Sequence, residues 1–144
     1  MKIYTIGYEG TTMAEFVATL KAAGVEQIID VRAVPLSRRP GFSKNILAAS
    51  LKEAGIGYAG LKALGTPKAG RDAAKKGDVA TLESVYDAQL GLPEAQIEAA
   101  RMRELAAERP SALLCFERDP AHCHRTLLLA AEGEGLEVVD LYAS

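Results

Sequence analysis

The sequence predicts a single α/β domain over residues 1–144, with a mostly parallel sheet of about five strands flanked by helices in a Rossmann-like or flavodoxin-like three-layer arrangement. Two observations favour this fold class. Strand-like and helix-like segments alternate along the chain, as in repeated strand–helix–strand units. The length and the 49% apolar content are typical of one soluble globular domain with a sizeable core.

The first two elements are a strand and a helix. The strand runs from Lys2 to about Ile6. Thr12 and Glu15 have the spacing of a capping box, and apolar residues then recur at helical spacing. Gly24 supplies the left-handed residue with which such helices commonly end.

Residues 27–60 predict a strand, a loop, a helix and a short strand. The strand covers residues 27–31, and two prolines mark the loop after it. Ser43 is placed to cap a helix that stops at Gly55. A third, short strand follows over residues 57–60.

The second half begins with a segment poor in apolar residues. Residues 65–78 are dominated by Gly, Lys and Arg, and we expect a long mobile loop. Helices are predicted from Asp78 to Leu90 and from Pro93 to a point before Pro110. The remaining elements are a buried strand over 112–116, a helix over 123–132 and a last strand over 136–142.

Composition and charge exclude several classes of protein. The 17 basic and 19 acidic side chains leave a net charge of −2, so no overall attraction to nucleic acid or anionic membranes follows. No apolar run approaches the ~20 residues that span a bilayer, and the N-terminus lacks the features of a signal peptide. The only cysteines, Cys115 and Cys123, are too few for a disulfide scaffold. We expect a cytoplasmic protein with reduced thiols and no membrane partner.

Cofactor and metal motifs are not met. Residues 55–60 fit G-x-G-x-x-G, but a helix precedes them and a strand follows, which is the reverse of a dinucleotide site. Cys115, His122, Cys123 and His124 lack the usual zinc-ligand spacings, since three of them are consecutive. We therefore expect no organic cofactor and no metal.

Ionisable side chains concentrate just after three predicted strands, and ligands of parallel α/β sheets bind outside these carboxyl ends. Asp30 and Arg32 share one strand face, as do Cys115 and Glu117. A structural ion pair is the simplest alternative role for Asp30 and Arg32. The candidate catalytic residues are Glu9, Glu117, Cys123 and His124, and the candidate ligand-binding residues are Tyr8, Asp30, Arg32, Ser37, Arg38, Cys115 and Arg125.

The same segments resemble the domain of unknown function 488 family. The similar motifs are Thr5–Gly10, Asp30–Arg32, Ser37–Arg38, Gly55–Tyr58, Leu114–Glu117 and Cys123–Arg125, in the order of the family and over nearly the whole chain. The resemblance implies a compact α/β domain but no particular reaction. Family members often carry a second glycine where this chain has Thr66, which implies a difference in the flexibility or contacts of the following loop.

Our leading hypothesis is an enzyme, or an enzyme-like binding protein, for a small anionic ligand of phosphate or nucleotide type. Arg32, Arg38 and Arg125 would hold the anion, because guanidinium groups suit phosphate and carboxylate. Glu9 or Glu117 would act as acid or base in hydrolysis or group transfer without an organic cofactor.

Two alternatives stay open. The basic region 38–76 favours a nucleic-acid-binding protein. A thiol-dependent enzyme would use Cys123 as nucleophile or redox centre, with His122 or His124 beside it. A purely structural or partner-binding role is also open, because an exposed apolar patch cannot be recognised in a sequence, and the oligomeric state is not predicted.

Overall fold

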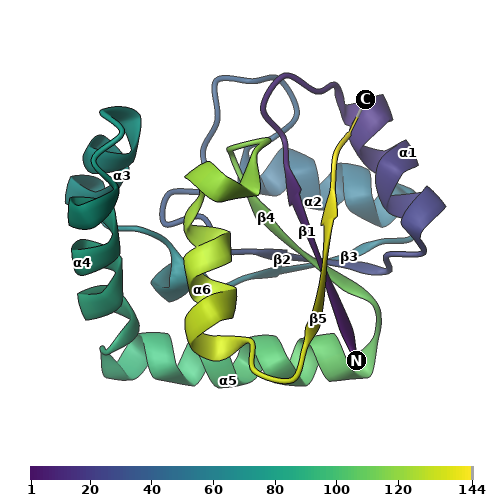
Figure 1. The fold of residues 1–144 in the computed structure, drawn as a ribbon. Coiled ribbons are helices and arrows are strands. Elements are labelled where there is room, and N and C mark those ends of the chain that lie inside the picture. The colour runs from purple at the N-terminus through teal and green to yellow at the C-terminus, as the bar shows by residue number, and fades with distance from the viewer. Residues whose placement is uncertain (144) are drawn as a thin grey trace.

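The computed structural model describes residues 1–143 and, for His122, the backbone alone. Over these residues five parallel strands form one sheet in the order β3–β2–β4–β1–β5 (Figure 1). The strands are β1 (Lys2–Gly7), β2 (Gln27–Asp30), β3 (Gly57–Gly60), β4 (Ser111–Cys115) and β5 (Glu137–Leu141). The helices are α1 (Met13–Ala23), α2 (Lys44–Glu53), α3 (Lys68–Lys75), α4 (Val79–Leu90), α5 (Pro93–Glu108) and α6 (His124–Glu132), with 3₁₀ turns η1 (Lys62–Leu64) and η2 (Pro120–His122). The predicted α/β fold class is confirmed.

Two apolar clusters cover the two faces of the sheet. Ala112 and Leu114 of β4 pack in one cluster with side chains of α1 and α2. Leu113, between them in sequence, packs in the other cluster with side chains of α4, α5 and α6. Successive strand residues point to opposite faces, so this alternation makes β4 the centre of a three-layer core.

The topology places a crevice at the carboxyl end of β4. The helices that follow β1 and β2 lie on one face, whereas the helix that follows β4 lies on the other. Because β4 sits between β2 and β1, the chain leaves neighbouring strands toward opposite faces. This is the topological switch point at which parallel sheets bind their ligands.

Local capping matches the expectations for α1. The Thr12 side chain accepts a hydrogen bond from the Glu15 amide, and the Glu15 carboxylate accepts one from the Thr12 amide, so the capping box is present. Gly24 ends the helix with φ +77°. Ser43 precedes α2 as predicted, but its hydroxyl donates to the Ser37 carbonyl and caps no helical amide.

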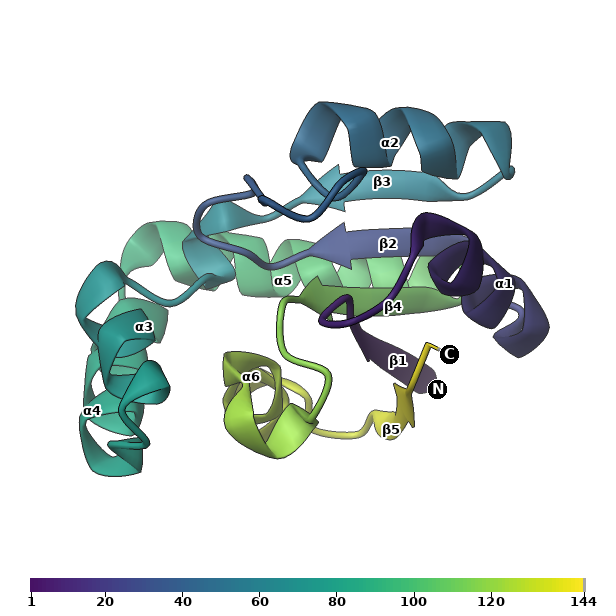
Figure 2. The ribbon, with the colours of Figure 1, turned by 90° about the horizontal axis from the view of Figure 1, so that it is seen from above.

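The prediction of a long mobile loop over residues 65–78 is wrong, because eight of these residues form α3. Gly70 and Ala73 form its buried side, and a Cβ at Gly70 would lie 2.4 Å from the Thr66 Cγ2 atom. A helix that buries only small residues has no apolar stripe of the usual kind. Figure 2 shows α3 and α4 beside each other, beyond the arrow tips of β2 and β4.

The remaining sequence-based elements agree with the structure within a residue or two. The buried strand ends at Cys115, one residue early, and leaves Phe116 46% exposed. None of the helices within residues 1–143 combines the length and apolar character needed to cross a membrane.

Candidate functional site

The loops after β1 and β4 lie against each other. The Tyr8 amide donates to the Cys115 carbonyl at 3.3 Å, and the Glu9 amide donates to the Phe116 carbonyl at 2.8 Å. Gly7 permits this approach, because a Cβ there would lie 1.7 Å from the Glu117 carbonyl oxygen. The backbone of Glu117 is therefore held in close contact with the end of β1.

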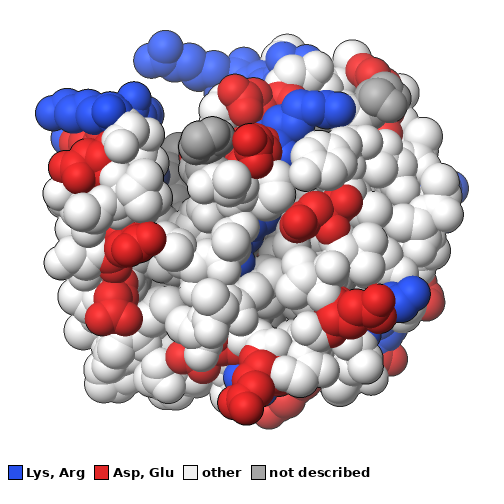
Figure 3. Space-filling view, viewed as in Figure 1, with Lys and Arg blue, Asp and Glu red and all other residues white. Residues whose placement is uncertain are grey.

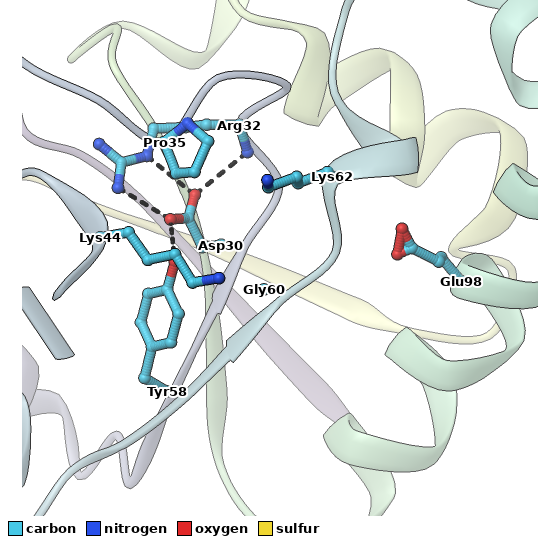
Figure 4. Close-up of a pocket in the computed structure, with 8 residues that line it drawn as sticks. All are labelled: Asp30, Arg32, Pro35, Lys44, Tyr58, Gly60, Lys62 and Glu98. Atoms are coloured by element: carbon cyan, nitrogen blue, oxygen red, sulfur yellow. Dashed lines mark hydrogen bonds and ion pairs between the residues drawn. The ribbon is translucent and has the colours of Figure 1, made fainter.

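At the end of β2, each of the two carboxylate oxygens of Asp30 accepts two hydrogen bonds. Its Oδ1 accepts from the Arg32 amide and Nε, at 3.1 and 2.9 Å. Its Oδ2 accepts from the Arg32 guanidinium at 2.8 Å and from the Tyr58 hydroxyl (Figure 4). Asp30 is 1% exposed, so this carboxylate positions Arg32 and Tyr58.

Charge and burial act together on the partners of Asp30. Burial by itself disfavours the charged guanidinium, but the hydrogen bond and charge of Asp30 raise the pKa of Arg32 above its ordinary value. Burial and the same carboxylate raise the pKa of Tyr58. Arg32 is thus permanently cationic, and Tyr58 stays a neutral hydroxyl donor.

A small pocket of about 200 Å³ adjoins this network on the β3 side. Figure 4 shows the side chains of Lys44 and Lys62 near the Asp30 carboxylate, with Glu98 further away. The Glu98 carboxylate accepts a hydrogen bond from the Ala63 amide at 2.7 Å. This pocket is smaller than typical sites for metabolites.

A larger cavity of about 530 Å³, here called the strand-end cleft, lies between the carboxyl ends of the strands and α3. Its volume falls within the range of small-molecule sites. The side chains that line it are Tyr8, Arg32, Ala33, Val34, Leu36, Thr66, Arg71, Ala74, Lys75, Leu82, Cys115, Phe116, Glu117 and His124. The fold therefore brings five of the candidate residues, namely Tyr8, Arg32, Cys115, Glu117 and His124, to one cavity.

The charge of the strand-end cleft is mainly positive. Arg32, Arg71 and Lys75 line it, and Glu117 is the one acidic side chain among its described lining residues. Arg71 is oriented by a 2.8 Å hydrogen bond from its guanidinium to the Thr66 carbonyl. Figure 3 shows Lys and Arg side chains gathered along the upper edge of the molecule, including over α3.

An unpaired hydroxyl lies in the wall of the strand-end cleft. Thr66 is 3% exposed, and its Oγ1 has no hydrogen-bond partner within residues 1–143. A buried hydroxyl without a partner costs free energy, so Thr66 is a locally unfavourable feature of this wall.

Aromatic contacts fix the position of Arg32. Tyr8 stacks on Phe42 with 4.8 Å between ring centroids and meets Phe116 edge to face. The Arg32 guanidinium carbon lies 5.2 Å from the centroid of the Tyr8 ring. The Arg32 guanidinium also donates a 2.7 Å hydrogen bond to the Phe42 carbonyl.

The expectation of two reduced thiols is wrong for this structure, in which Cys115 and Cys123 form a disulfide. Cys115 ends β4 and Cys123 precedes α6, and the η2 turn folds the chain back so that the two side chains meet. In this oxidised state neither residue offers the free thiol that a thiol-dependent enzyme needs. The side chain of His122 lies outside the described residues.

His124 is a neutral histidine with an assigned tautomer. Burial lowers its pKa to about 4. Its Nε2 lies 2.8 Å from the Val31 carbonyl oxygen, so Nε2 carries the proton and Nδ1 has the lone pair. Nδ1 faces the Cys123 sulfur at 3.8 Å.

Three other candidates lie outside the strand-end cleft. Glu9 is exposed, and its carboxylate accepts from the Arg118 amide at 3.1 Å. Ser37 organises its own loop, because its hydroxyl accepts from the Arg39 amide. Arg38 is exposed and makes no side-chain hydrogen bond or ion pair with any described residue.

Arg125 is buried away from the strand-end cleft. It is 0% exposed and donates from one terminal nitrogen to the Arg118 carbonyl at 3.0 Å. Its Nε and other terminal nitrogen have no hydrogen-bond partner within the described chain. Burial lowers the pKa of this guanidinium, while nearby carboxylates, including that of Glu117, oppose the shift.

Sequence reasoning missed Thr66, Arg71 and Lys75 as cleft residues. The expected loop over 65–78 concealed the i, i+4 spacing that puts Arg71 and Lys75 on one side of α3. That spacing was the available signal, although nothing local indicated that α3 turns this side toward the sheet.

The family model described as "Domain of unknown function DUF488" matches residues 12–131. Neither the curated proteins nor the solved structures yielded a match to the chain.

Proposed function

The chain belongs to the DUF488 family of domains of unknown function, and on that premise we propose that it binds a small phosphate-bearing ligand in the strand-end cleft. The observation that carries the proposal is the convergence of Arg32, Arg71 and Lys75 on one cavity. Such a constellation is suited to an anion, because guanidinium and ammonium groups form strong charge-assisted hydrogen bonds to phosphate.

Arg32 is the fixed element of the proposed anion site. Three of its N–H groups are held by Asp30 and the Phe42 carbonyl, and its side chain also interacts with the Tyr8 hydroxyl. A guanidinium held in this way loses little conformational entropy on binding.

Glu117 is the carboxylate that hydrolysis or group transfer would use. It lines the same cavity as Arg32 and Arg71, so a bound phosphate ester would lie between these cations and one carboxylate. A positioned carboxylate can take a proton from water or return one to a leaving group.

We expect Arg71→Gln to weaken the binding of a mononucleotide by about tenfold, because a hydrogen bond to a charged group contributes about 1.5–3 kcal/mol. Lys75→Gln should weaken it by about threefold, since Lys75 is exposed. Isothermal titration calorimetry at fixed ionic strength measures both.

Lys76→Gln is the matched control, because Lys76 neighbours Lys75 but does not line the strand-end cleft. If the Lys75 and Lys76 variants lost the same amount of affinity, the loss would come from the changed net charge of the protein and not from a contact in the strand-end cleft. Undetectable binding of inorganic phosphate, mononucleotides and sugar phosphates to the unaltered protein would overturn the proposal.

A short oligonucleotide tests the nucleic-acid alternative in the same titration. A cleft that holds one phosphate group predicts similar affinities for the mononucleotide and the oligonucleotide. Tighter oligonucleotide binding that falls steeply with added salt would instead indicate contacts with several phosphates along the basic region 38–76.

A further inference from the structure

Three ligand atoms of the kinds that bind transition metals meet at the end of β4. The sulfurs of Cys115 and Cys123 and a carboxylate oxygen of Glu117 lie within 4.8 Å of one another. Cys115 and Cys123 are 1% and 3% exposed, and Glu117 is half-buried. Cys115 and Glu117 of this group line the strand-end cleft, and Cys123 lies buried behind them.

The fold assembles this group from two directions. Cys115 is the last residue of β4, Glu117 follows two residues later in the loop, and their ligand atoms lie close together. Cys123 returns to the same place as the residue that precedes α6. The partial positive charge at the start of a helix favours an anionic sulfur at this position.

We propose that the reduced form of this chain binds one Zn²⁺ through Cys115, Glu117 and Cys123. Zinc–sulfur and zinc–oxygen bonds of about 2.3 and 2.0–2.2 Å place tetrahedral ligand atoms roughly 3.5–4 Å apart. The observed group needs only small side-chain movements to reach that spacing once its sulfurs separate. Three protein ligands leave a fourth position, which faces the strand-end cleft because Cys115 and Glu117 line it.

Metal binding requires prior reduction of the disulfide. A phosphine reductant transfers two electrons to the sulfur–sulfur bond, and with one water gives two thiols and the phosphine oxide. Zn²⁺ then replaces the two thiol protons, which are released to solvent. Added hydrogen peroxide takes two electrons from the two thiolates, so that the disulfide forms again, the peroxide becomes two hydroxide ions and Zn²⁺ is released.

The surroundings supply compensating charge. Two thiolates and one carboxylate around Zn²⁺ carry a net charge of −1. The buried guanidinium of Arg125 interacts electrostatically with Glu117 and has two nitrogens without hydrogen-bond partners within residues 1–143. A buried cation of this kind stabilises an anionic centre nearby.

Zinc affinity of the reduced and oxidised protein tests the proposal. We expect one Zn²⁺ per reduced chain in competition with a chromophoric chelator, and at least about a hundredfold weaker binding to the oxidised chain. Equal affinity of the two forms, or no competition by the reduced form, would refute the assignment.

Co²⁺, used in place of Zn²⁺ as a spectroscopic probe, shows which side chains coordinate the metal. The reduced protein should show sulfur-to-cobalt charge-transfer absorption, which Cys115→Ala and Cys123→Ala each diminish. Glu117→Gln should weaken Co²⁺ binding by at least about tenfold, whereas the exposed control Glu134→Gln should not change it. Unchanged Co²⁺ affinity in Glu117→Gln would remove Glu117 from the ligand set and contradict the proposal.

The proposed zinc site and the proposed anion site can be tested independently of each other. Lys75→Gln removes a charge that the anion site uses and the metal site does not, so its zinc affinity should equal that of the unaltered chain. Zinc binding measured without any phosphate therefore stands or falls independently of the proposed function.

Discussion

Replacing Asp30 with Asn is expected to lower the free energy of unfolding by about 3–5 kcal/mol, because it leaves a buried guanidinium without its counter-charge. Asp30 and Arg32 are 1% and 6% exposed, so water cannot replace the lost carboxylate oxygen. Tyr58 would also lose its charged acceptor. Arg32 would keep its hydrogen bond to the Phe42 carbonyl and its contact with the Tyr8 ring, but neither of these carries a negative charge.

Urea denaturation followed by circular dichroism measures this loss. The control is Asp72→Asn, which breaks the exposed ion pair of Asp72 with Lys68 and should cost about 0.5 kcal/mol or less. A loss below about 1 kcal/mol for Asp30→Asn would mean that the guanidinium finds water or another acceptor. The anion site would then lack its fixed element, because Arg32 owes its orientation to Asp30.

The sequence predicts those parts of the structure that depend on neighbouring residues. The capping box of Thr12 and Glu15 is a local pattern, and the structure contains it. The pairing of Asp30 with Arg32 follows from strand alternation, and the structure shows it as an ion pair. In both cases the interacting groups are separated by less than one turn of helix or one repeat of a strand.

The parts that the sequence does not predict depend on distant packing. The position of Arg38 after β2 is correct, but position along the chain does not tell which way its side chain points. Arg125 likewise lies in the first turn of α6 as expected, and yet its side chain is buried in the interior. The unpaired Thr66 hydroxyl exists only because α3 closes over the turn that carries it, which no local pattern indicates.

The disulfide illustrates the same division between local pattern and distant packing. Cys115 and Cys123 are eight residues apart, a spacing that fits neither a redox C-x-x-C pair nor the usual zinc patterns. Their approach depends on η2, a turn capped by the Asp119 side chain through the Ala121 amide. The candidate metal group was therefore hidden from spacing rules and became visible only in three dimensions.

Gly7→Ala is expected to destabilise the protein by about 3 kcal/mol or more, because the new methyl group would overlap backbone. Its Cβ would lie 1.7 Å from the carbonyl oxygen and 2.4 Å from the carbonyl carbon of Glu117. A flexible side chain could move aside, but this segment is tied to β1 by the hydrogen bonds of Tyr8 and Glu9. The overlap must be relieved by moving the loop that carries Glu117.

Gly91→Ala is the matched control, since its Cβ would meet nothing closer than 3.5 Å at a φ of −77°. We expect that variant to stay within about 0.5 kcal/mol of the unaltered protein. Gly7→Ala should in addition weaken the binding of phosphate and of Zn²⁺ in variant protein that remains folded, because both proposed sites include Glu117 or its neighbours. A stable Gly7→Ala protein with both affinities intact would show that the loop after β4 can shift without loss, so that the close approach of β1 would not be what positions Glu117.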